Sequence, residues 1–517
     1  MAFLDDIPLP YYTVPVAGIS LVLLYSTFQQ WRSPLRKLPY PPGPPEKSFI
    51  AGNTSDMPTE RTWLAFAEWG RKYGSISHFR IFDQHTIILN SLEDNIELLE
   101  KRSNNYSDRP NLPMIDLMGW TGFDVGFMRY GARWRYHRRL FQQFFKPEAA
   151  LDFLPTQTRK VNDMLYGLLT TPDDFMNHYR TLPAAIIMAI TYDHDVAPKD
   201  DYFVNLAEAA VARLSQMFFP GASLLNAFPI LRFTPSWFPG AMFKRFALES
   251  RKLTYQMLEV PIADVEARMK TEKPPHCITS ELLQNCKSKQ EYDDIAGVVA
   301  TAYAAGADTT ASSLGTFFMA MALNPEIQAR AKKDLDLVVG SDRLVNIDDR
   351  PSMPYLEAIY REVVRWRPVV PLGVAHAAME DDVYKGYYIP KGATVISNIW
   401  AVNHDPVKYP NPEKFNPDRY FNENGELNDD EVVTSFGFGR RICPGRHLAS
   451  ASAWLAIATV LQNFDISKKR DALGNEIPIS GEYCDGLITH PLPFECSITP
   501  RSEASKQLIL NAERTKH

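Results

Sequence analysis

A long, mostly apolar stretch from Tyr292 to Leu323 constrains the fold of this chain more than any other feature. Because Asn324 and Pro325 end it, the pattern predicts one helix that is unusually long for a globular protein and that crosses a whole domain. Most of the chain before Cys443 also has a helical pattern, whereas alternation over residues 75–92 indicates a few strands. With 517 residues, 45% of them hydrophobic, the chain can bury a large core. We therefore predict one large domain over residues 46–517, mainly α with a minor β part (α+β).

The N-terminal residues have the pattern of a membrane anchor. Residues 11–28 carry no charge and, as a helix, extend about 27 Å, which is just enough to cross the hydrocarbon core of a bilayer. Basic residues follow this run and aspartates precede it, so residues 1–10 are expected in the lumen and the main domain in the cytosol. The acidic leader disfavours a cleaved secretory signal. Residues 29–45 are basic and proline-rich, and we interpret them as a hinge.

Charge and cysteine content narrow the possible classes of protein. A formal net charge of -6 gives no basis for nucleic-acid binding. The cysteines, at positions 277, 286, 443, 484 and 496, are too few and too scattered for a disulfide framework. Such cysteine usage suits a catalytic domain in the reducing cytosol.

Cys443 lies in a glycine-rich loop, residues 436–446, with the sequence Phe-Gly-Phe-Gly-Arg-Arg-Ile-Cys-Pro-Gly-Arg, just before a predicted helix. A sulfur at a helix N-terminus faces free backbone N–H groups and the positive end of the helix dipole, which favours the thiolate that a metal needs. Gly437 and Gly439 permit loop conformations that other residues avoid. The alternative is a buried structural cysteine beside a tight turn, which is the commoner origin of a Cys-Pro-Gly sequence.

The full pattern of Phe436, Gly439, Arg441, Cys443 and Gly445 resembles the haem-binding signature of the cytochrome P450 family, the haem-thiolate monooxygenases. The resemblance implies the P450 fold and haem b (iron protoporphyrin IX), with the Cys443 thiolate as the axial iron ligand and Phe436 and Arg441 as cofactor-binding residues. Other stretches are similar to fungal, basidiomycete-like members of secondary metabolism. The anchor is similar to that of microsomal members, which implies a single-pass protein of the endoplasmic reticulum membrane.

A second motif, Ala-Gly-Ala-Asp-Thr-Thr at residues 305–310, lies within the long predicted helix. A threonine in mid-helix bonds back to the carbonyl four residues earlier, here Ala305, and Gly306 weakens the same turn, so we expect a bulge or kink. In isolation such a sequence is most often an exposed turn of helix. It is similar to the family's oxygen-activating motif, which implies that Asp308 is the acid and Thr309 the alcohol that deliver protons to bound oxygen.

A third motif places Glu362 and Arg365 three residues apart, on one face of a predicted helix. An ordinary surface ion pair is the alternative interpretation. The spacing resembles the family's Glu-x-x-Arg pair, and a later segment resembles the one that adds a second arginine, here Arg419. The usual phenylalanine after that arginine is Tyr420 in this chain. Two arginines that share one buried carboxylate form a scaffold rather than a catalytic group.

Further cofactor-binding residues follow from the resemblance alone. Trp134 and Arg138 match a helix whose Trp-x-x-x-Arg residues contact a haem propionate, although a basic amphipathic helix is the alternative. His376 lies where many members place another propionate partner, although a single histidine is more often structural. Together with Arg441, these residues are expected to complete the haem site.

Family geometry also implies an apolar distal pocket and therefore a lipophilic substrate, with a terpenoid favoured over aromatic, indole or polyketide compounds. The expected lining residues are Met114, Ile115, Leu117, Met118, Phe123, Val298, Val299, Ala302, Val369, Val370, Leu372, Leu487 and Ile488. Asp116 and Asp124 fall in the same region and raise a minor hypothesis of amine binding. The aromatic residues between positions 217 and 238 are expected either at the membrane surface beside an entrance or in the core.

The chain has no evident flavin, nicotinamide or iron–sulfur module, although monooxygenation consumes two electrons. The resemblance implies NADPH–cytochrome P450 reductase as the electron donor, cytochrome b5 as a further candidate, and O2 as co-substrate. Candidate docking residues are Arg135, Arg139, Arg440 and Arg446. A haem-thiolate isomerase or dehydratase without external electrons, and a haem-based sensor, are the alternatives, and the complete Asp308–Thr309 motif disfavours both.

Overall fold

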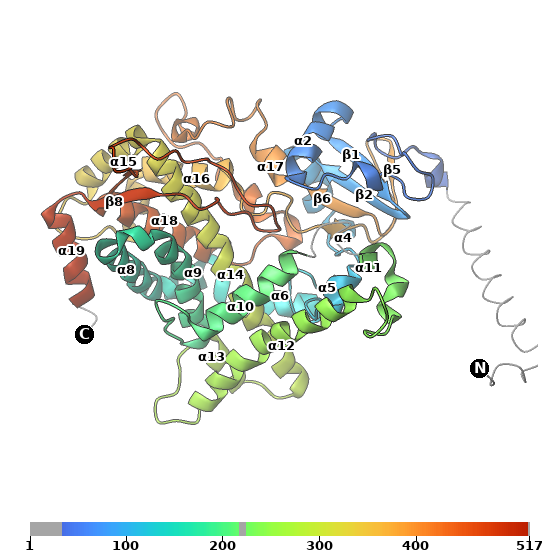
Figure 1. Ribbon diagram of the computed structural model, residues 1–517, viewed down its shortest axis with the longest axis horizontal. Coiled ribbons are helices and arrows are strands. Elements are labelled where there is room, and N and C mark those ends of the chain that lie inside the picture. The colour runs from blue at the N-terminus through green and yellow to red at the C-terminus, as the bar shows by residue number, and fades with distance from the viewer. Residues whose placement is uncertain (1–33, 217–223, 515–517) are drawn as a thin grey trace, which may run out of the picture.

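The computed structural model describes residues 34–216 and 224–514, which form a mainly helical protein with small sheets (Figure 1). This architecture confirms the predicted α+β fold with a minor β part. The predicted lumenal residues 1–10 and the predicted anchor, residues 11–28, lie outside the described residues. Among the helices of residues 34–216 and 224–514, none combines the length and the apolar character that crossing a membrane requires.

The long helix predicted from the sequence is α14 (Lys289–Leu323). Ser288 caps its N-terminus, because its side chain accepts a hydrogen bond from the Glu291 N–H at 3.2 Å. At 1.5 Å per residue the helix extends about 52 Å. It therefore crosses the domain, as predicted, and it packs along much of its length against α9 (Phe175–Tyr192).

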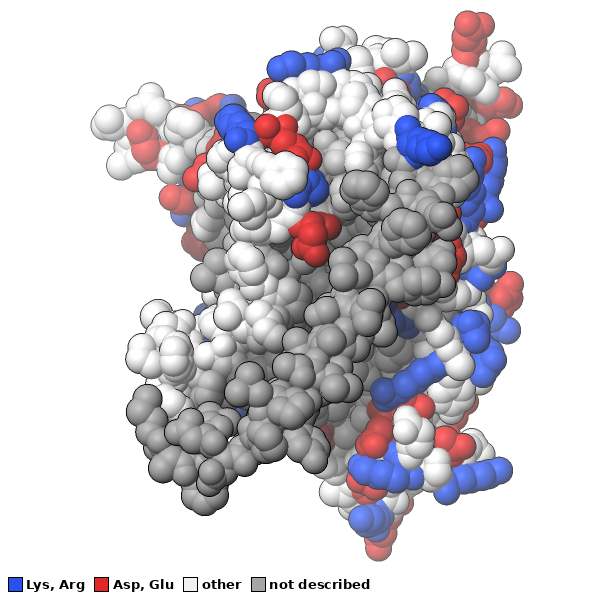
Figure 2. Space-filling view, turned by 90° about the vertical axis from the view of Figure 1, so that its right-hand side faces the viewer, with Lys and Arg blue, Asp and Glu red and all other residues white. Residues whose placement is uncertain are grey.

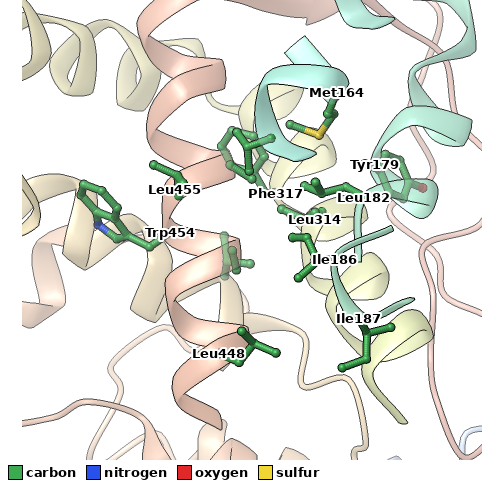
Figure 3. Close-up of a cluster of buried hydrophobic side chains, with 14 of the residues drawn as sticks. Met164, Tyr179, Leu182, Ile186, Ile187, Leu314, Phe317, Leu448, Trp454 and Leu455 are labelled. Atoms are coloured by element: carbon green, nitrogen blue, oxygen red, sulfur yellow. The ribbon is translucent and has the colours of Figure 1, made fainter. Parts of the chain in front are cut away.

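The main hydrophobic core lies where α14 and α9 pack against α8 (Leu154–Thr170) and α18 (Arg446–Asn463) (Figures 1 and 3). Phe317 of α14 and Trp454 of α18 are fully buried in this cluster. Burial of each large apolar side chain contributes about 1.5–3 kcal/mol. Because α18 follows Cys443 directly, this packing fixes the loop around Cys443 relative to α14.

The strands form one four-stranded sheet, in the order β1-β2-β6-β3, and two hairpins. β1 (Ile76–Ile81) and β2 (Gln84–Leu89) are antiparallel and match the alternation predicted over residues 75–92. β2 pairs in parallel with β6 (Thr394–Ser397), which in turn pairs with β3 (His376–Ala377). The hairpins are β4 (Asp382–Tyr384) with β5 (Tyr387–Ile389), and β7 (Phe464–Lys468) with β8 (Cys496–Pro500).

Other helices surround this framework, and α10 packs against α12 beside α14 (Figure 1). The longer ones are α2 (Thr62–Tyr73), α6 (Ala132–Phe145), α10 (Tyr202–Ser215), α12 (Met242–Arg268), α15 (Pro325–Val338), α16 (Pro354–Trp366) and α19 (Glu503–Arg514). The shorter ones are α3 (Leu92–Asn95), α4 (Ser103–Tyr106), α5 (Pro113–Leu117), α7 (Pro147–Ala150), α11 (Leu224–Ala227), α13 (Ile278–Gln284) and α17 (Ile399–Asn403).

The described end of the predicted hinge lies against the sheet. The His78 N–H donates to the Pro42 carbonyl at 3.1 Å, and the Tyr40 ring stacks on the rings of His78 and His85 with centroids 4.7 Å apart in each case. Gly43 permits this approach, since a Cβ there would lie 1.8 Å from the His78 carbonyl oxygen. Residues 40–43 are thus packed on the domain.

Candidate active site

Cys443 lies in a loop that closes just before α18. Its N–H donates to the carbonyl of Phe436, the last residue of the 3-10 turn Val433–Phe436, at 2.8 Å, and a second 3-10 turn, Gly439–Arg441, lies within the loop. Gly439 has a φ of 54°, and a Cβ there would lie 2.1 Å from the Leu99 carbonyl oxygen. Only glycine fits at this position. The loop geometry therefore depends on the glycine pattern that the sequence indicated.

Two opposing effects act on the Cys443 thiol. Burial raises its pKa, whereas the N–H groups of Gly445 and Arg446 and the positive charges of Arg138 and Arg446 act in the opposite direction. In the protein alone, the helix N-terminus lowers the pKa of Cys443 by less than burial raises it. A metal cation would supply the further positive charge that ionises the thiol. In residues 34–216 and 224–514 no three His, Cys, Asp or Glu side chains gather to hold a metal ion.

Asn403 fixes the start of this loop from behind. Its buried side chain donates to Ser435 Oγ at 2.8 Å and accepts from Thr434 Oγ1 at 3.0 Å, while its backbone carbonyl accepts from Arg365 Nη1 at 2.8 Å. Ser435 directly precedes Phe436, whose carbonyl closes the loop. Asn403 therefore links the Cys443 loop to α16, through its side chain on one side and its backbone carbonyl on the other.

Glu362 and Arg365 form the predicted buried pair on α16, with both side chains 0% exposed. Arg365 donates to the two carboxylate oxygens at 2.7 and 2.8 Å, and Arg419 Nε donates to Glu362 Oε1 at 3.2 Å. These distances confirm the triad expected from the sequence. The Tyr420 hydroxyl also donates to Glu362, at 3.2 Å, a bond that a phenylalanine at this position cannot make.

Arg441 is enclosed by backbone oxygen atoms and an aromatic ring. Its guanidinium lies 4.3 Å from the centroid of the Trp134 ring. It forms no ion pair with a carboxylate in the described part of the chain and donates instead to the carbonyls of Ser107, Val125 and Met128, at 2.7, 3.0 and 2.9 Å. Burial and the repulsion of Arg109 lower the pKa of Arg441 to about 8.

Arg109 and His376 lie beside Arg441, although no sequence motif pointed to Arg109. Arg109 is 5% exposed, and its guanidinium donates to three backbone carbonyls at 2.6 to 2.8 Å. Burial lowers its pKa to about 10. His376 Nδ1 is 2.7 Å from the Tyr106 carbonyl oxygen, and burial together with the Arg109 charge holds the pKa of His376 well below its usual range.

Arg138 of α6 completes a cluster of basic side chains, Arg109, Arg138, Arg441 and His376, which we call the cationic cluster after its three guanidinium groups. Burial lowers the pKa of Arg138, and the charge of Cys443 opposes this shift. Among the described residues Arg138 has no hydrogen-bond or ion-pair partner. Buried cations that lack carboxylate partners repel one another unless an anion joins them. The cluster therefore fits the two propionates of a haem whose iron lies at Cys443.

Trp134 packs directly against Arg441. Its indole N–H donates to the Val125 carbonyl at 3.2 Å, and this carbonyl also accepts a bond from Arg441. The ring at the same time lies against the Arg441 guanidinium. In this structure Trp134 therefore supports Arg441 and has its own donor already paired.

The Ala305–Thr310 turn belongs to α14, which packs against α18, the helix that follows Cys443. Thr309 Oγ1 donates to the Ala305 carbonyl at 2.9 Å, as predicted. The expected bulge is absent, since α14 continues as a regular helix through this turn. Gly306 instead allows close packing, because a Cβ there would lie 3.2 Å from the Ile187 side chain of α9. Ala305 is exposed while the flanking turns are buried, so this face of α14 borders an open space.

The expected distal lining divides into two groups. The half-buried residues, which are available to a ligand, are Leu117, Val369, Val370, Leu372, Leu487 and Ile488. The residues buried within the core are Met114, Ile115, Met118, Phe123, Val298, Val299 and Ala302. Met114 and Ile115 are buried because α5 packs against α12, and Val298, Val299 and Ala302 belong to the buried part of α14.

Neither candidate carboxylate for an amine is free. Asp116 Oδ2 is paired with Arg232 at 3.2 Å and its Oδ1 accepts from Thr121 Oγ1 at 2.6 Å. Asp124 is buried, and its Oδ1 accepts from the Gly126 N–H at 2.7 Å. Burial raises the pKa of Asp124 to about 6. These contacts oppose the amine-binding hypothesis.

A cavity of about 250 Å³ opens between the four-stranded sheet and the loops that carry Leu372 and Leu487. Its lining also includes Trp63, His85 and Leu112. Because Leu372 and Leu487 belong as well to the expected distal lining, the cavity is a candidate entrance for a small molecule.

Two of the predicted docking arginines, Arg135 and Arg139, lie on α6. Both are exposed, whereas Trp134 is buried and Arg138 is half-buried. Arg440 is also exposed and donates to Tyr130 and Asn104, whereas Arg446 is half-buried. The exposed arginines can therefore present positive charge to a partner.

Comparisons with known proteins agree with this geometry. The Cytochrome P450 family model matches residues 41–497. Cytochrome P450 monooxygenase COX1 of Coprinopsis cinerea is 40% identical over 487 residues, 92% of this chain and 94% of that protein. Cytochrome P450 monooxygenase claR of Ampulloclitocybe clavipes is 38% identical (92% and 89% covered), and Cytochrome P450 monooxygenase 98 of Postia placenta is 38% identical (97% and 97%). These relatives confirm the resemblance to fungal, basidiomycete members. The chain therefore belongs to the cytochrome P450 family of monooxygenases.

Proposed function

We propose that this enzyme inserts one oxygen atom of O2 into a lipophilic small molecule, by hydroxylation or further oxidation. The observations that carry the proposal are Cys443 in its closed loop, the cationic cluster beside it, and Asp308 with Thr309 on α14. Haem b, when bound, supplies the redox chemistry that activates O2.

Each part of the site has a proposed role toward the cofactor. The Cys443 thiolate holds the iron, and the cationic cluster holds the propionates. Phe436 closes the cysteine loop and Trp134 supports Arg441. An anion at the cluster would raise the pKa of both Arg441 and His376, because it would offset the mutual repulsion of the cations.

Asp308 and Thr309 are the proposed catalytic residues. The Thr309 hydroxyl accepts and donates hydrogen bonds beside the open space, and the Asp308 carboxylate exchanges protons with water. Oxygen activation consumes protons and external electrons, whereas a haem-thiolate isomerase or dehydratase needs no external electrons. The presence of both groups therefore supports a monooxygenase over that alternative.

A terpenoid, in a tailoring step of fungal secondary metabolism, is the proposed substrate. The half-buried distal residues are apolar, and Asp116 and Asp124 are already paired or buried, so a hydrocarbon-like substrate suits the pocket better than an amine. An aromatic, indole or polyketide substrate is the second candidate. Electrons are proposed to come from NADPH through a separate cytochrome P450 reductase, with cytochrome b5 as a further donor, at the face that carries Arg135, Arg139 and Arg440.

Co-expression of the full chain with a reductase and a set of terpene hydrocarbons tests the function. We expect an oxygenated product that requires NADPH and O2. In Thr309→Ala, NADPH should still be oxidised, but product per NADPH should fall about tenfold and hydrogen peroxide should rise. The matched control is Thr301→Ala, which removes the same type of back-bond, to Gly297 at 2.7 Å, two turns earlier in α14. Product formed without NADPH would instead identify an isomerase or dehydratase.

The proposed location is the endoplasmic reticulum membrane, crossed by residues 11–28. Large apolar side chains gather on the side that carries the β1–β2 hairpin and α11, with Phe49 94% and Trp237 77% exposed. Figure 2 views this side, where charged atoms concentrate in the upper and right-hand parts of the view. Residues 217–223 of the predicted aromatic segment lie outside the described residues.

The sequons at Asn53 and Asn105 report the topology. When the full chain is expressed in a eukaryotic host, we expect it in the membrane fraction after carbonate extraction, because residues 11–28 span the bilayer. Treatment with an endoglycosidase should leave its mobility unchanged, since a cytosolic domain is not glycosylated. A mobility shift would place the domain in the lumen, and release by carbonate would exclude a spanning anchor.

A further inference from the structure

Asp308 is held by a histidine from a distant part of the chain. His490 Nε2 lies 3.1 Å from Asp308 Oδ1, and the two side chains are 21% and 38% exposed. No motif in the sequence includes His490. The pair matters because Asp308 is the proposed acid of proton delivery, and any group bound to its carboxylate affects that task.

His490 lies in a hairpin, residues 483–491, that hydrogen bonds within the hairpin close. The Cys484 N–H donates to the His490 carbonyl at 2.9 Å, and the His490 N–H donates to Cys484 Sγ at 3.2 Å. One residue further out on each side, Tyr483 pairs with Pro491. His490 therefore has a fixed backbone position within the hairpin.

Contacts of Thr489 dock this hairpin on α14. Its carbonyl accepts a hydrogen bond from Ser312 Oγ, one turn after Asp308 on the same helix, and its N–H donates to the Val369 carbonyl at 2.9 Å. Thr489 is 4% exposed. Because these bonds hold the hairpin against α14, the His490 imidazole is placed opposite Asp308, unlike an ion pair between two freely moving surface chains.

Two further charged groups face this pair from neighbouring helices. Burial raises the pKa of Glu208 of α10, and the negative charge of Asp308 raises it further. Arg180 of α9 and His490 act on Glu208 in the opposite direction. Glu208 is thus electrostatically coupled to both members of the pair, and Arg180 to Glu208.

We infer that His490 is the positioning residue for Asp308, because its imidazole holds the carboxylate in place and replaces the proton that Asp308 gives up. This role rests on the proposed function. In the step, the proton on His490 Nε2 moves to the Asp308 carboxylate, which leaves a neutral imidazole and a neutral acid. The imidazole is then reprotonated by a hydronium ion from bulk solvent, so that each cycle moves one proton from the solvent to Asp308.

The role makes proton delivery dependent on pH. Imidazole is the side chain whose charge ordinarily changes near neutral pH. A neutral imidazole neither attracts the Asp308 carboxylate nor carries a proton for it. Product per NADPH should therefore fall with rising pH, whereas a purely structural contact gives no such trend.

The pairing is tested first without turnover. The haem-loaded full chain is treated with diethyl pyrocarbonate at one fixed pH, and the rate at which His490 is modified is measured by mass spectrometry in the wild type and in Asp308→Asn. Loss of the carboxylate should speed the modification of His490 about threefold, because the ion pair no longer covers Nε2 and holds its proton. The exposed His276 should react at the same rate in both proteins. An unchanged rate at His490 would overturn the pairing.

The role in proton delivery is tested next with His490→Gln, which keeps a donor without a charge, and His490→Arg, which keeps a charge that does not titrate. Hydrogen peroxide per NADPH, a readout that needs no identified substrate, should rise about threefold in His490→Gln. Its pH dependence should disappear in both variants and persist in the control His276→Gln. A wild-type pH profile in His490→Gln refutes the role. Since the footprint requires no turnover, its outcome is separate from that of Thr309→Ala, which tests the proposed function.

Discussion

Replacement of Cys443 by alanine is expected to abolish the carbon monoxide spectrum of a thiolate-ligated ferrous haem, together with all NADPH-dependent product formation. The loss should be complete, because the described residues offer no second cysteine in this loop and no cluster of other metal-ligating side chains. The fold should survive. The bond from residue 443 to the Phe436 carbonyl uses only backbone atoms, and Asn403 holds the loop through Thr434 and Ser435.

Cys286→Ala is the matched control, since this half-buried thiol lies outside the site and donates only to the Ser288 carbonyl at 3.4 Å. It should keep the wild-type spectrum and activity. Far-ultraviolet circular dichroism of both variants separates loss of the ligand from loss of the fold. A thiolate-type spectrum retained by folded Cys443→Ala would refute the assignment of the iron ligand.

Glu362→Gln is expected to lower the free energy of unfolding by about 3–5 kcal/mol. The substitution keeps the shape of the side chain but leaves Arg365 and Arg419 without their shared negative charge. Arg365 is 0% exposed, so water cannot replace the carboxylate. Arg365 also donates to the backbone carbonyl of Asn403, whose side chain holds the Cys443 loop, so the variant should lose haem earlier during unfolding. Denaturant unfolding followed by circular dichroism and by haem absorbance measures both effects.

Glu357→Gln on the same helix is the comparison. Glu357 pairs with Arg350 at 2.8 Å and Arg361 at 3.3 Å, but these partners lie nearer the surface. We expect a loss of about 1 kcal/mol and normal haem retention. An equal decrease in the free energy of unfolding in the two variants would show that burial of the Glu362 triad does not increase its contribution to stability.

Local sequence patterns predicted those parts of the site whose geometry depends on neighbouring residues. A helix is built from bonds four residues apart, so the extent of α14 and the bond from Thr309 to Ala305 followed from spacing alone. The glycines around Cys443 were also informative, because a positive φ at Gly439 is a local requirement. The bulge in α14 was wrongly expected, since packing of Ile187 against Gly306 accounts for the glycine.

The sequence by itself thus determined the family pattern, the long helix and the cysteine loop, in which the interacting residues are close along the chain. Only the tertiary structure decided which distant groups meet there. It brought Arg109 to the cationic cluster, paired the Trp134 donor with a backbone carbonyl, and placed His490 on Asp308. Burial and charge act through space, so no spacing rule along the chain could assign those partners.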